Sequence, residues 1–368
     1  MKKNTKLTFQ IAAVFIGTIV GAGLASGQEI TQFFTVYGPI SFVTIIICVF
    51  LYIIICKIII YISLKYRLTS YDSFINKIDK SYMGYITHIC TSFFLIASAS
   101  IILAGSGSLL NQYFNISKWF GILIMSSLTL YTLLKDTNGL IKINSFIVPS
   151  LIFVITLTFI LYISFSKNIP STMELKAISI NEDFWIISLL KKYNLNIFLI
   201  FIPFLSSILY GSFNILSCSG VLVPLSFEMK NKKVLDRGII LGAVGLTFLT
   251  LIINYLLLVN TPSIYKYEIP LLFILNRFGK PMQILLLVII WMEMFSTEVS
   301  DIYSVGKTME NSLNIPYKMS VIIILAIAIP ISQIGFVKLI SILYPAFSLI
   351  SFIFLVKCII FYIKDKKG

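Results

Sequence analysis

The chain has 368 residues, of which 58% are hydrophobic and only 12% are charged, and its formal net charge is +14. A soluble domain carries about 25% charged residues, so this composition excludes a soluble protein and predicts a polytopic protein of the lipid bilayer. The basic residues are spread between apolar runs and do not cluster on one soluble face, so we expect no nucleic-acid partner. No obligate protein partner is predicted either.

Cysteine and histidine are too scattered to form a metal centre. The five cysteines lie inside apolar runs without a C-x-x-C pair, and His88 is the only histidine. Neither a disulfide framework nor a Cys/His site can be assembled from them. We therefore interpret the cysteines as packing residues and expect no cofactor.

The N-terminus resembles a secretory signal in two respects. Lys2, Lys3 and Lys6 precede an apolar stretch, and Ala25-Ser26-Gly27 is compatible with a cleavage site. Signal regions are not normally rich in glycine, and the later spans need no removable leader. The sequence therefore favours a retained first span over a signal peptide.

The first predicted span, residues 9–36, contains four glycines in mid-span, which are Gly17, Gly21, Gly23 and Gly27. Glycine lowers helix stability, and hydrocarbon offers no water to freed backbone groups, so non-helical backbone survives at this depth only where it lines a cavity or binds a ligand. We predict a broken helix with a binding site at the break. The alternative is close helix packing, because Gly17/Gly21 and Gly23/Gly27 have G-x-x-x-G spacing.

The segment Gly21-Ala22-Gly23 is the predicted cradle, since a ligand can approach a backbone that carries minimal side chains. Two half-helices that meet end to end expose N–H groups, which attract an anion, and carbonyl groups, which attract a cation. Glu29 falls in the first turn of the second half-helix, where we expect it to bind a ligand amine or a proton. A helix-start acid near the outer interface is the alternative.

Runs of about 20 apolar residues predict ten spans. Their ranges are 9–36, 40–64, 84–112, 118–134, 144–166, 196–227, 238–260, 281–305, 319–335 and 338–363. Lysine and arginine are in excess in the segments that this count places on the same side as the N-terminus. By the positive-inside rule, we expect both termini to be cytoplasmic, in a bacterial cytoplasmic membrane.

Ten spans divide into two sets of five, which predicts inverted repeats over about 9–166 and 196–363 within a single membrane domain, 1–368. The odd number per set turns the second set upside down in the membrane, and an outer loop, 167–195, joins the two sets. A second outer segment, 261–280, has an apolar core too short to span the membrane. It is either a lid over the outer mouth or a surface helix.

The first helix of each repeat is broken in inverted-repeat transporters, so the sixth span tests this interpretation. Gly211, Gly220 and Pro224 interrupt its helical pattern, and several polar side chains lie at depth. The sequence therefore predicts a second break, in the span that opens the second repeat.

Beside this predicted break lie Tyr210, Phe213 and Asn214. An aromatic ring at an unwound segment can close over a substrate, and an amide can donate to a carboxylate or ligate a cation. We expect these residues to bind substrate; ordinary core packing is the alternative.

In the eighth span, polar residues occur at positions i, i+3, i+4, i+7, i+8 and i+11, so they form a stripe along one face of the predicted helix. Its members are Glu293, Ser296, Thr297, Ser300, Asp301 and Ser304. Intramembrane carboxylates cost about 2.5–3.5 kcal/mol each, so we expect this face to look into the bundle or a wet cavity. Hydroxyls and carboxylates suit Na⁺ or a proton relay through Glu293 and Asp301. Interhelical hydrogen bonding is the alternative, and Glu298 is predicted to point away from the stripe.

Two motifs carry a resemblance to a known family. The run FIGTIVGAGLASGQE resembles the I-G-x-x-I-G-x-G signature of amino acid–polyamine–organocation (APC) superfamily transporters, and FEMKNKKVLDRG is similar to the E-x-K-N-P segment after their sixth helix. Together with LYGSFN and FSTEVSDIY, these segments resemble the YkvI-type bacterial membrane proteins of that superfamily. The resemblance covers nearly all ten spans.

This resemblance implies an all-α LeuT-type fold of ten helices with a substrate site between spans 1, 3, 6 and 8. By the same likeness, the backbone at Gly21, Ala22 and Gly23 would hold a substrate carboxylate. Na⁺ would be bound by Ser296 and Thr297 with carbonyls near two residues of the first span, Gly17 and Val20. The sequence departs from the amino acid transporters at Lys232, which replaces a proline, and in the sixth-span motif, which leaves the substrate class open.

The combined interpretation is a secondary active transporter of a small organic solute, an amino acid or related compound, that works by alternating access coupled to Na⁺ or H⁺. The alternative is a non-transporting nutrient or germinant sensor subunit with the same fold. We expect no enzyme and no catalytic residues, because the spans contain neither a nucleophile–base pair nor a metal set.

Overall fold

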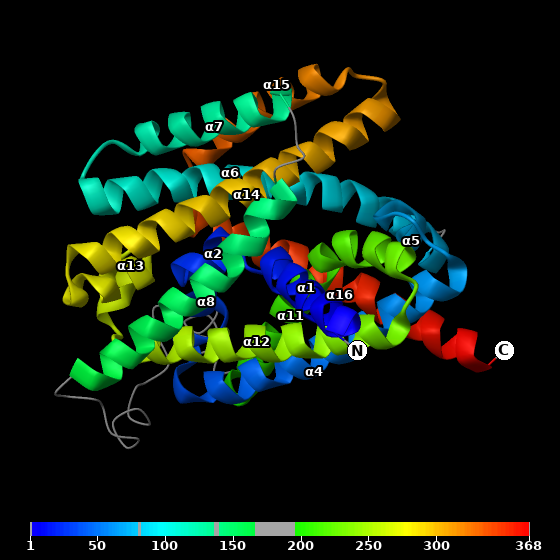
Figure 1. Ribbon diagram of the computed structural model, residues 1–368, viewed down its shortest axis with the longest axis horizontal. Helices are drawn as coiled ribbons and strands as arrows, with labels where there is room; N and C mark the ends of the chain where they lie inside the picture. The colour runs from blue at the N-terminus through cyan, green and yellow to red at the C-terminus, as the bar shows by residue number, and fades with distance from the viewer. Residues whose placement is uncertain (1, 80–81, 136–139, 166–195, 368) are drawn as a thin grey trace.

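The computed structural model describes residues 2–79, 82–135, 140–165 and 196–367, and within these ranges the chain is helical, without a strand (Figure 1). The predicted outer loop, 167–195, lies outside the described residues. Seven of the described helices are long and apolar enough to cross a membrane.

The first span is broken, as predicted. Helix α1 (Lys2–Ile19) ends before Gly21, whose backbone is extended, with φ −112° and ψ −168°. The short helix α2 (Ala22–Ser26) follows and ends at Gly27, whose φ of +84° is a left-handed conformation that glycine adopts without strain. Helix α3 (Gln28–Phe33) continues the span.

The remaining long helices coincide with the predicted spans, except that α12 begins at Lys232, ahead of the predicted 238, and α14 ends at Leu313, beyond the predicted 305. A 3₁₀ turn, η1 (Thr35–Ile40), leads into α4 (Ser41–Tyr66) and α5 (Tyr71–Ile78). They are followed by α6 (Tyr82–Phe114), α7 (Lys118–Lys135), α8 (Leu140–Phe165), α11 (Asn196–Met229), α12 (Lys232–Leu258), η2 (Ser263–Lys266), α13 (Pro270–Leu275), η3 (Asn276–Phe278), α14 (Lys280–Leu313), α15 (Tyr317–Ser332) and α16 (Phe336–Lys367). The count of ten membrane crossings and the division into inverted repeats stay predictions.

The break predicted in the sixth span is wrong: α11 is continuous from Asn196 to Met229. Its polar side chains are satisfied within the helix, because Ser212 and Ser219 donate to the carbonyls of Ile208 and Leu216, at 2.7 and 2.6 Å. Gly211 instead permits close packing, since a Cβ at this position would lie 3.2 Å from Leu51 of α4. Polar groups at depth therefore did not require unwound backbone here.

The long helices form two groups (Figure 1). Helices α1, α4, α11 and α12 pack against one another, and α6, α7, α14 and α15 form a second group. Helix α16 contacts both groups through α11 and α6, and the short α2 touches α6 and α14 of the second group. The break in the first span therefore lies where the two groups meet.

Gly238 on α12 allows α1 to pack closely against this helix. A Cβ added at Gly238 would lie 2.6 Å from the Cβ of Ile11 and 3.3 Å from the carbonyl oxygen of Thr8. A Cβ added at Gly220 of α11, in contrast, would meet no atom within 4 Å.

We predict that Gly238→Ala lowers the free energy of unfolding by about 1–3 kcal/mol, because neither a backbone oxygen nor a branched Cβ can move aside cheaply. The control Gly220→Ala should leave stability unchanged or raise it by up to about 1 kcal/mol through helix propensity. Thermal unfolding of both variants in the same detergent measures the difference. Equal stability of Gly238→Ala and the parent chain would contradict the packing described here.

Candidate functional site

A buried carboxyl group, that of Glu29, lies at the centre of the broken span. Gly27 adopts a left-handed conformation between α2 and α3, and Glu29, in the first turn of α3, is only 2% exposed. A Cβ at Gly23 would overlap the Glu29 carboxyl group. Gly23 is therefore needed to seat Glu29, which differs from its predicted role as part of a substrate cradle.

Two tyrosine hydroxyls hold the Glu29 carboxyl group. Tyr210 of α11 donates to its Oε2 at 3.2 Å, and Tyr344 of α16 is a second hydrogen-bond partner. The Tyr210 ring is wedged between Phe33 and Phe34, with ring centroids 5.2 and 5.1 Å away. None of the ion pairs among the described residues involves Glu29, so this carboxyl group is buried without a basic partner in that part of the chain.

The other sixth-span candidates lie in the same cluster. Asn214 donates to the backbone carbonyl of Tyr210 at 3.1 Å and to the hydroxyl of Tyr52 at 3.3 Å. The ring of Phe213 lies 4.8 Å from the Tyr344 ring and 5.2 Å from that of Phe94 on α6. The structure therefore brings Glu29, Tyr210, Phe213 and Asn214 together, although the break predicted beside them is absent.

The backbone break leaves space at Gly21. Val20 and Ala22 are buried, but Gly21 is partly exposed, and a Cβ added there would meet no atom within 4 Å. No side chain caps the start of α2. Gly21 is thus a position in the break with free space beside its backbone.

The predicted sodium ligands come from two elements, the first span with Gly17 and Val20 and helix α14 with Ser296 and Thr297. A Cβ at Gly17 would lie 2.8 Å from Val148 of α8, and Val20 donates its N–H to Ile16 within the first helix. On α14, Thr297 donates to the Glu293 carbonyl at 3.0 Å. Helix α14 packs against both α2 and α8. The binding of one ion by all of these residues stays a prediction.

The polar stripe of α14 is only partly enclosed. Glu293 and Ser296 are buried, whereas Ser300 and Ser304 are exposed and donate to the carbonyls four residues earlier, at 2.9 and 2.8 Å. The prediction that the stripe faces the bundle or a wet cavity holds for the bundle at Glu293 and Ser296, and for the C-terminal half it stays a prediction. The hydroxyls there are satisfied by their own helix.

Sequence analysis placed Glu298 only as pointing away from the stripe and gave it no role, and in the structure it is fully buried on α14. Both of its carboxyl oxygens lack a hydrogen-bond partner among the described residues. Asp301, one turn later, is within electrostatic range of it and is hydrogen-bonded by Ser98 of α6. The i, i+3 spacing of these two acids was the signal that could have found this pair.

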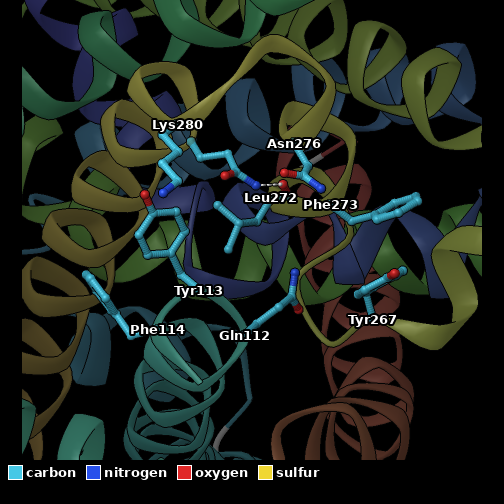
Figure 2. A pocket seen from close by; sticks show the side chains of 9 residues that line it. Gln112, Tyr113, Phe114, Tyr267, Leu272, Phe273, Asn276 and Lys280 are labelled. Atoms are coloured by element: carbon cyan, nitrogen blue, oxygen red, sulfur yellow. Dashed lines mark hydrogen bonds between the residues drawn. The ribbon is translucent and has the colours of Figure 1, made fainter. Parts of the chain in front are cut away.

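A groove of about 540 Å³ opens at the α13 end of the molecule (Figure 2). The side chains of Tyr113 on α6 and Lys280 on α14 point toward one another across it. Its floor is fixed by Gln112, whose amide donates to the Ile269 carbonyl at 2.9 Å and accepts from the Ile269 N–H at 3.0 Å. The segment between α12 and α14 is thus tied to α6.

This segment, predicted as a lid or a surface helix, packs into the interior. Ile264, Ile269, Leu271 and Ile274 are buried, and Leu271 lies against Gly27 at the break. A surface helix would leave one face free, so the packing favours the lid interpretation, which stays a prediction.

No family model matches the sequence. The chain is 28% identical over 355 residues to the YkvI membrane protein of Bacillus subtilis (strain 168), covering 96% of each chain. It is 27% identical over 353 residues to the YyaD protein of the same organism, covering 95% of each. The predicted resemblance to YkvI-type membrane proteins is confirmed.

Several solved transporters share the fold. A manganese transporter of Eremococcus coleocola superimposes with TM-score 0.58 at 16% identity, over 96% of this chain and 76% of that one. An inward-facing form of Mhp1 gives 0.59 at 13%, over 94% and 73%, and a Na⁺-coupled sialic acid symporter gives 0.60 at 15%, over 93% and 75%. The all-helical LeuT-type fold is thereby confirmed, and these neighbours are transporters and not enzymes.

The contact between Gly23 and Glu29 gives a sharp prediction. Gly23→Ala should lower the free energy of unfolding by about 1–3 kcal/mol, because the added methyl group displaces the buried carboxyl group from its tyrosine partners. Gly21→Ala, two residues away in the same break, should change stability by no more than about 0.5 kcal/mol.

A double-mutant cycle separates this contact from a general effect on the break. In a Glu29→Ala background, most of the cost of Gly23→Ala should vanish, because the group that the methyl displaces is gone. Thermal unfolding measures all four chains. Additive effects of the two substitutions would show that Gly23 does not serve Glu29.

Proposed function

We propose that the chain is a secondary active transporter of a small organic solute, an amino acid or related compound, coupled to Na⁺ or H⁺. The supporting observation is the broken first span, which holds a buried carboxyl group without a basic partner among the described residues beside a backbone position open to a ligand. We further propose that it works in the cytoplasmic membrane with both termini on the cytoplasmic side.

The chemistry of the break suits a zwitterion. A carboxylate removed from water costs several kcal/mol unless a cation or a proton accompanies it, and the ammonium group of an amino acid would supply that charge to Glu29. The uncapped N–H groups that begin α2 would face the solute carboxylate. Tyr210 and Tyr344, the partners of Glu29, and Phe213, which contacts Tyr344, would line this site with aromatic rings.

Alternating access requires contacts at both ends that open in turn. At the α13 end, Lys118 of α7 pairs with Glu268 at 2.7 Å. At the opposite end, near α5 and the C-terminus in Figure 1, Lys65 pairs with Asp365 at 2.8 Å, and Lys357 pairs with Asp79. Exposed ion pairs of this kind contribute little to stability, so each could break during a transport cycle.

Uptake into proteoliposomes tests the proposal. With an imposed Na⁺ or pH gradient, we expect at least one amino acid to accumulate, and we expect Glu29→Gln to weaken its apparent affinity about ten- to hundredfold, since a charged hydrogen bond contributes about 1.5–3 kcal/mol. Glu310→Gln, which changes a partly exposed acid paired with Lys307 on α14, is the control. Solute binding without flux would favour a sensor, and neither binding nor flux would refute the proposal.

Thr297 tests the sodium ligand set. Its hydroxyl bonds only to its own helix in the structure, at the Glu293 carbonyl, so Thr297→Val should fold with a loss of about 1 kcal/mol. We predict that uptake by this variant no longer responds to a Na⁺ gradient. An undiminished sodium response would remove Thr297 from the ion site.

A further inference from the structure

Buried acids outside the broken span form a second cluster, at the contact between α14 and α6. Glu298 is fully buried, and neither of its carboxyl oxygens has a hydrogen-bond partner among the described residues. Asp301 lies one helical turn further along, and its Oδ2 is also buried and without a hydrogen bond in that part of the chain. The cluster is distinct from Glu29, which two tyrosines satisfy.

Such a pair needs a compensating charge. An unpaired buried carboxyl group costs at least several kcal/mol, and none of the ion pairs among the described residues reaches Glu298 or Asp301. A proton shared by the two acids would appear as a short oxygen-to-oxygen hydrogen bond, but no such bond joins them in the structure. The carboxyl oxygens are instead presented without partners of their own.

We propose that Glu298 and Asp301 form a binding site for a small hard cation. Carboxylate and hydroxyl oxygens are the donors that such cations prefer. Ser98 of α6 is hydrogen-bonded to Asp301 and acts as a positioning residue from the neighbouring helix. The i, i+3 spacing on α14 places both acids on the same side of that helix.

One member of the pair is partly accessible. Asp301 is partly exposed while Glu298 is buried, and the exposed hydroxyls of Ser300 and Ser304 lie on either side of Asp301 in the chain, so we expect an ion to reach Asp301 before Glu298. Tyr344 lies within electrostatic range of Asp301 and is also a hydrogen-bond partner of Glu29. Through Tyr344 we expect occupation of the pair to influence Glu29, which would link this site to the proposed transport function without depending on it.

Cation binding to the purified protein tests this proposal directly. Thermal unfolding in detergent is followed while choline chloride is replaced by Na⁺, K⁺, Mg²⁺ or Ca²⁺ salts at constant ionic strength and pH, and binding is confirmed by equilibrium dialysis. We expect Na⁺, Mg²⁺ or Ca²⁺ to raise the unfolding temperature of the parent chain. Glu298→Gln and Asp301→Asn should abolish this rise, and Ser98→Ala should weaken the apparent affinity about tenfold.

Glu310→Gln is the matched control, since Glu310 lies on the same helix but is partly exposed and paired with Lys307 at 2.7 Å. It should respond to cations as the parent chain does. Because Glu298→Gln preserves the shape of the side chain and removes a buried charge, it should fold, and Asp301→Asn gives an independent reading if it does not.

The proposal is overturned if no cation stabilises the parent chain, or if Glu298→Gln and Asp301→Asn respond as strongly as the parent. Stabilisation by lower pH with no response to any cation would assign protons to the pair and would equally overturn it. The readout requires no transport, so absence of solute uptake alongside cation binding would refute only the proposed transport function.

Discussion

The site depends on one constraint, a buried carboxyl group that has no basic partner in the part of the chain that the structure describes. Glu29 can be held beside Gly23 only because that residue has no side chain and because Gly27 adopts a left-handed turn. Tyr210 and Tyr344 then bring α11 and α16 to the same point. One carboxyl group therefore joins the broken span to helices from the second half of the chain.

The Glu29 carboxyl group lies between the two sets of helices, where a change in its charge could alter how the sets pack. The short α2 contacts α6 and α14, whereas α1 packs on α11 and α12. A change of charge at Glu29, from a solute amine or from an ion bound nearby, acts where these two sets meet. Tyr344, which is hydrogen-bonded to Glu29 and lies within electrostatic range of Asp301, would carry such coupling over a short distance.

The sequence predicted the span limits and the first break because glycine in mid-membrane has a direct physical cost. It also placed Glu29, Tyr210 and Asn214 near one another. The prediction failed at the sixth span. A glycine- and serine-rich sequence is compatible both with an unwound helix and with a continuous helix whose serine hydroxyls donate to carbonyls one turn earlier, as Ser212 does. The role of Glu298 was not predicted, because helical spacing shows on which side of a helix a residue lies but not which neighbouring helix packs against that side.

The central claim is that Gly21 opens the buried cluster to a small solute. The most direct measurement places a cysteine there, Gly21→Cys, in a chain whose five native cysteines are replaced by alanine, and follows its reaction with a small membrane-impermeant thiol reagent. We predict that the thiol reacts and that a mixture of the twenty amino acids slows the reaction, while Ala25→Cys, fully buried one turn later, stays unreactive. An unreactive thiol at position 21, or a reaction that no amino acid slows, would contradict a solute site at the break.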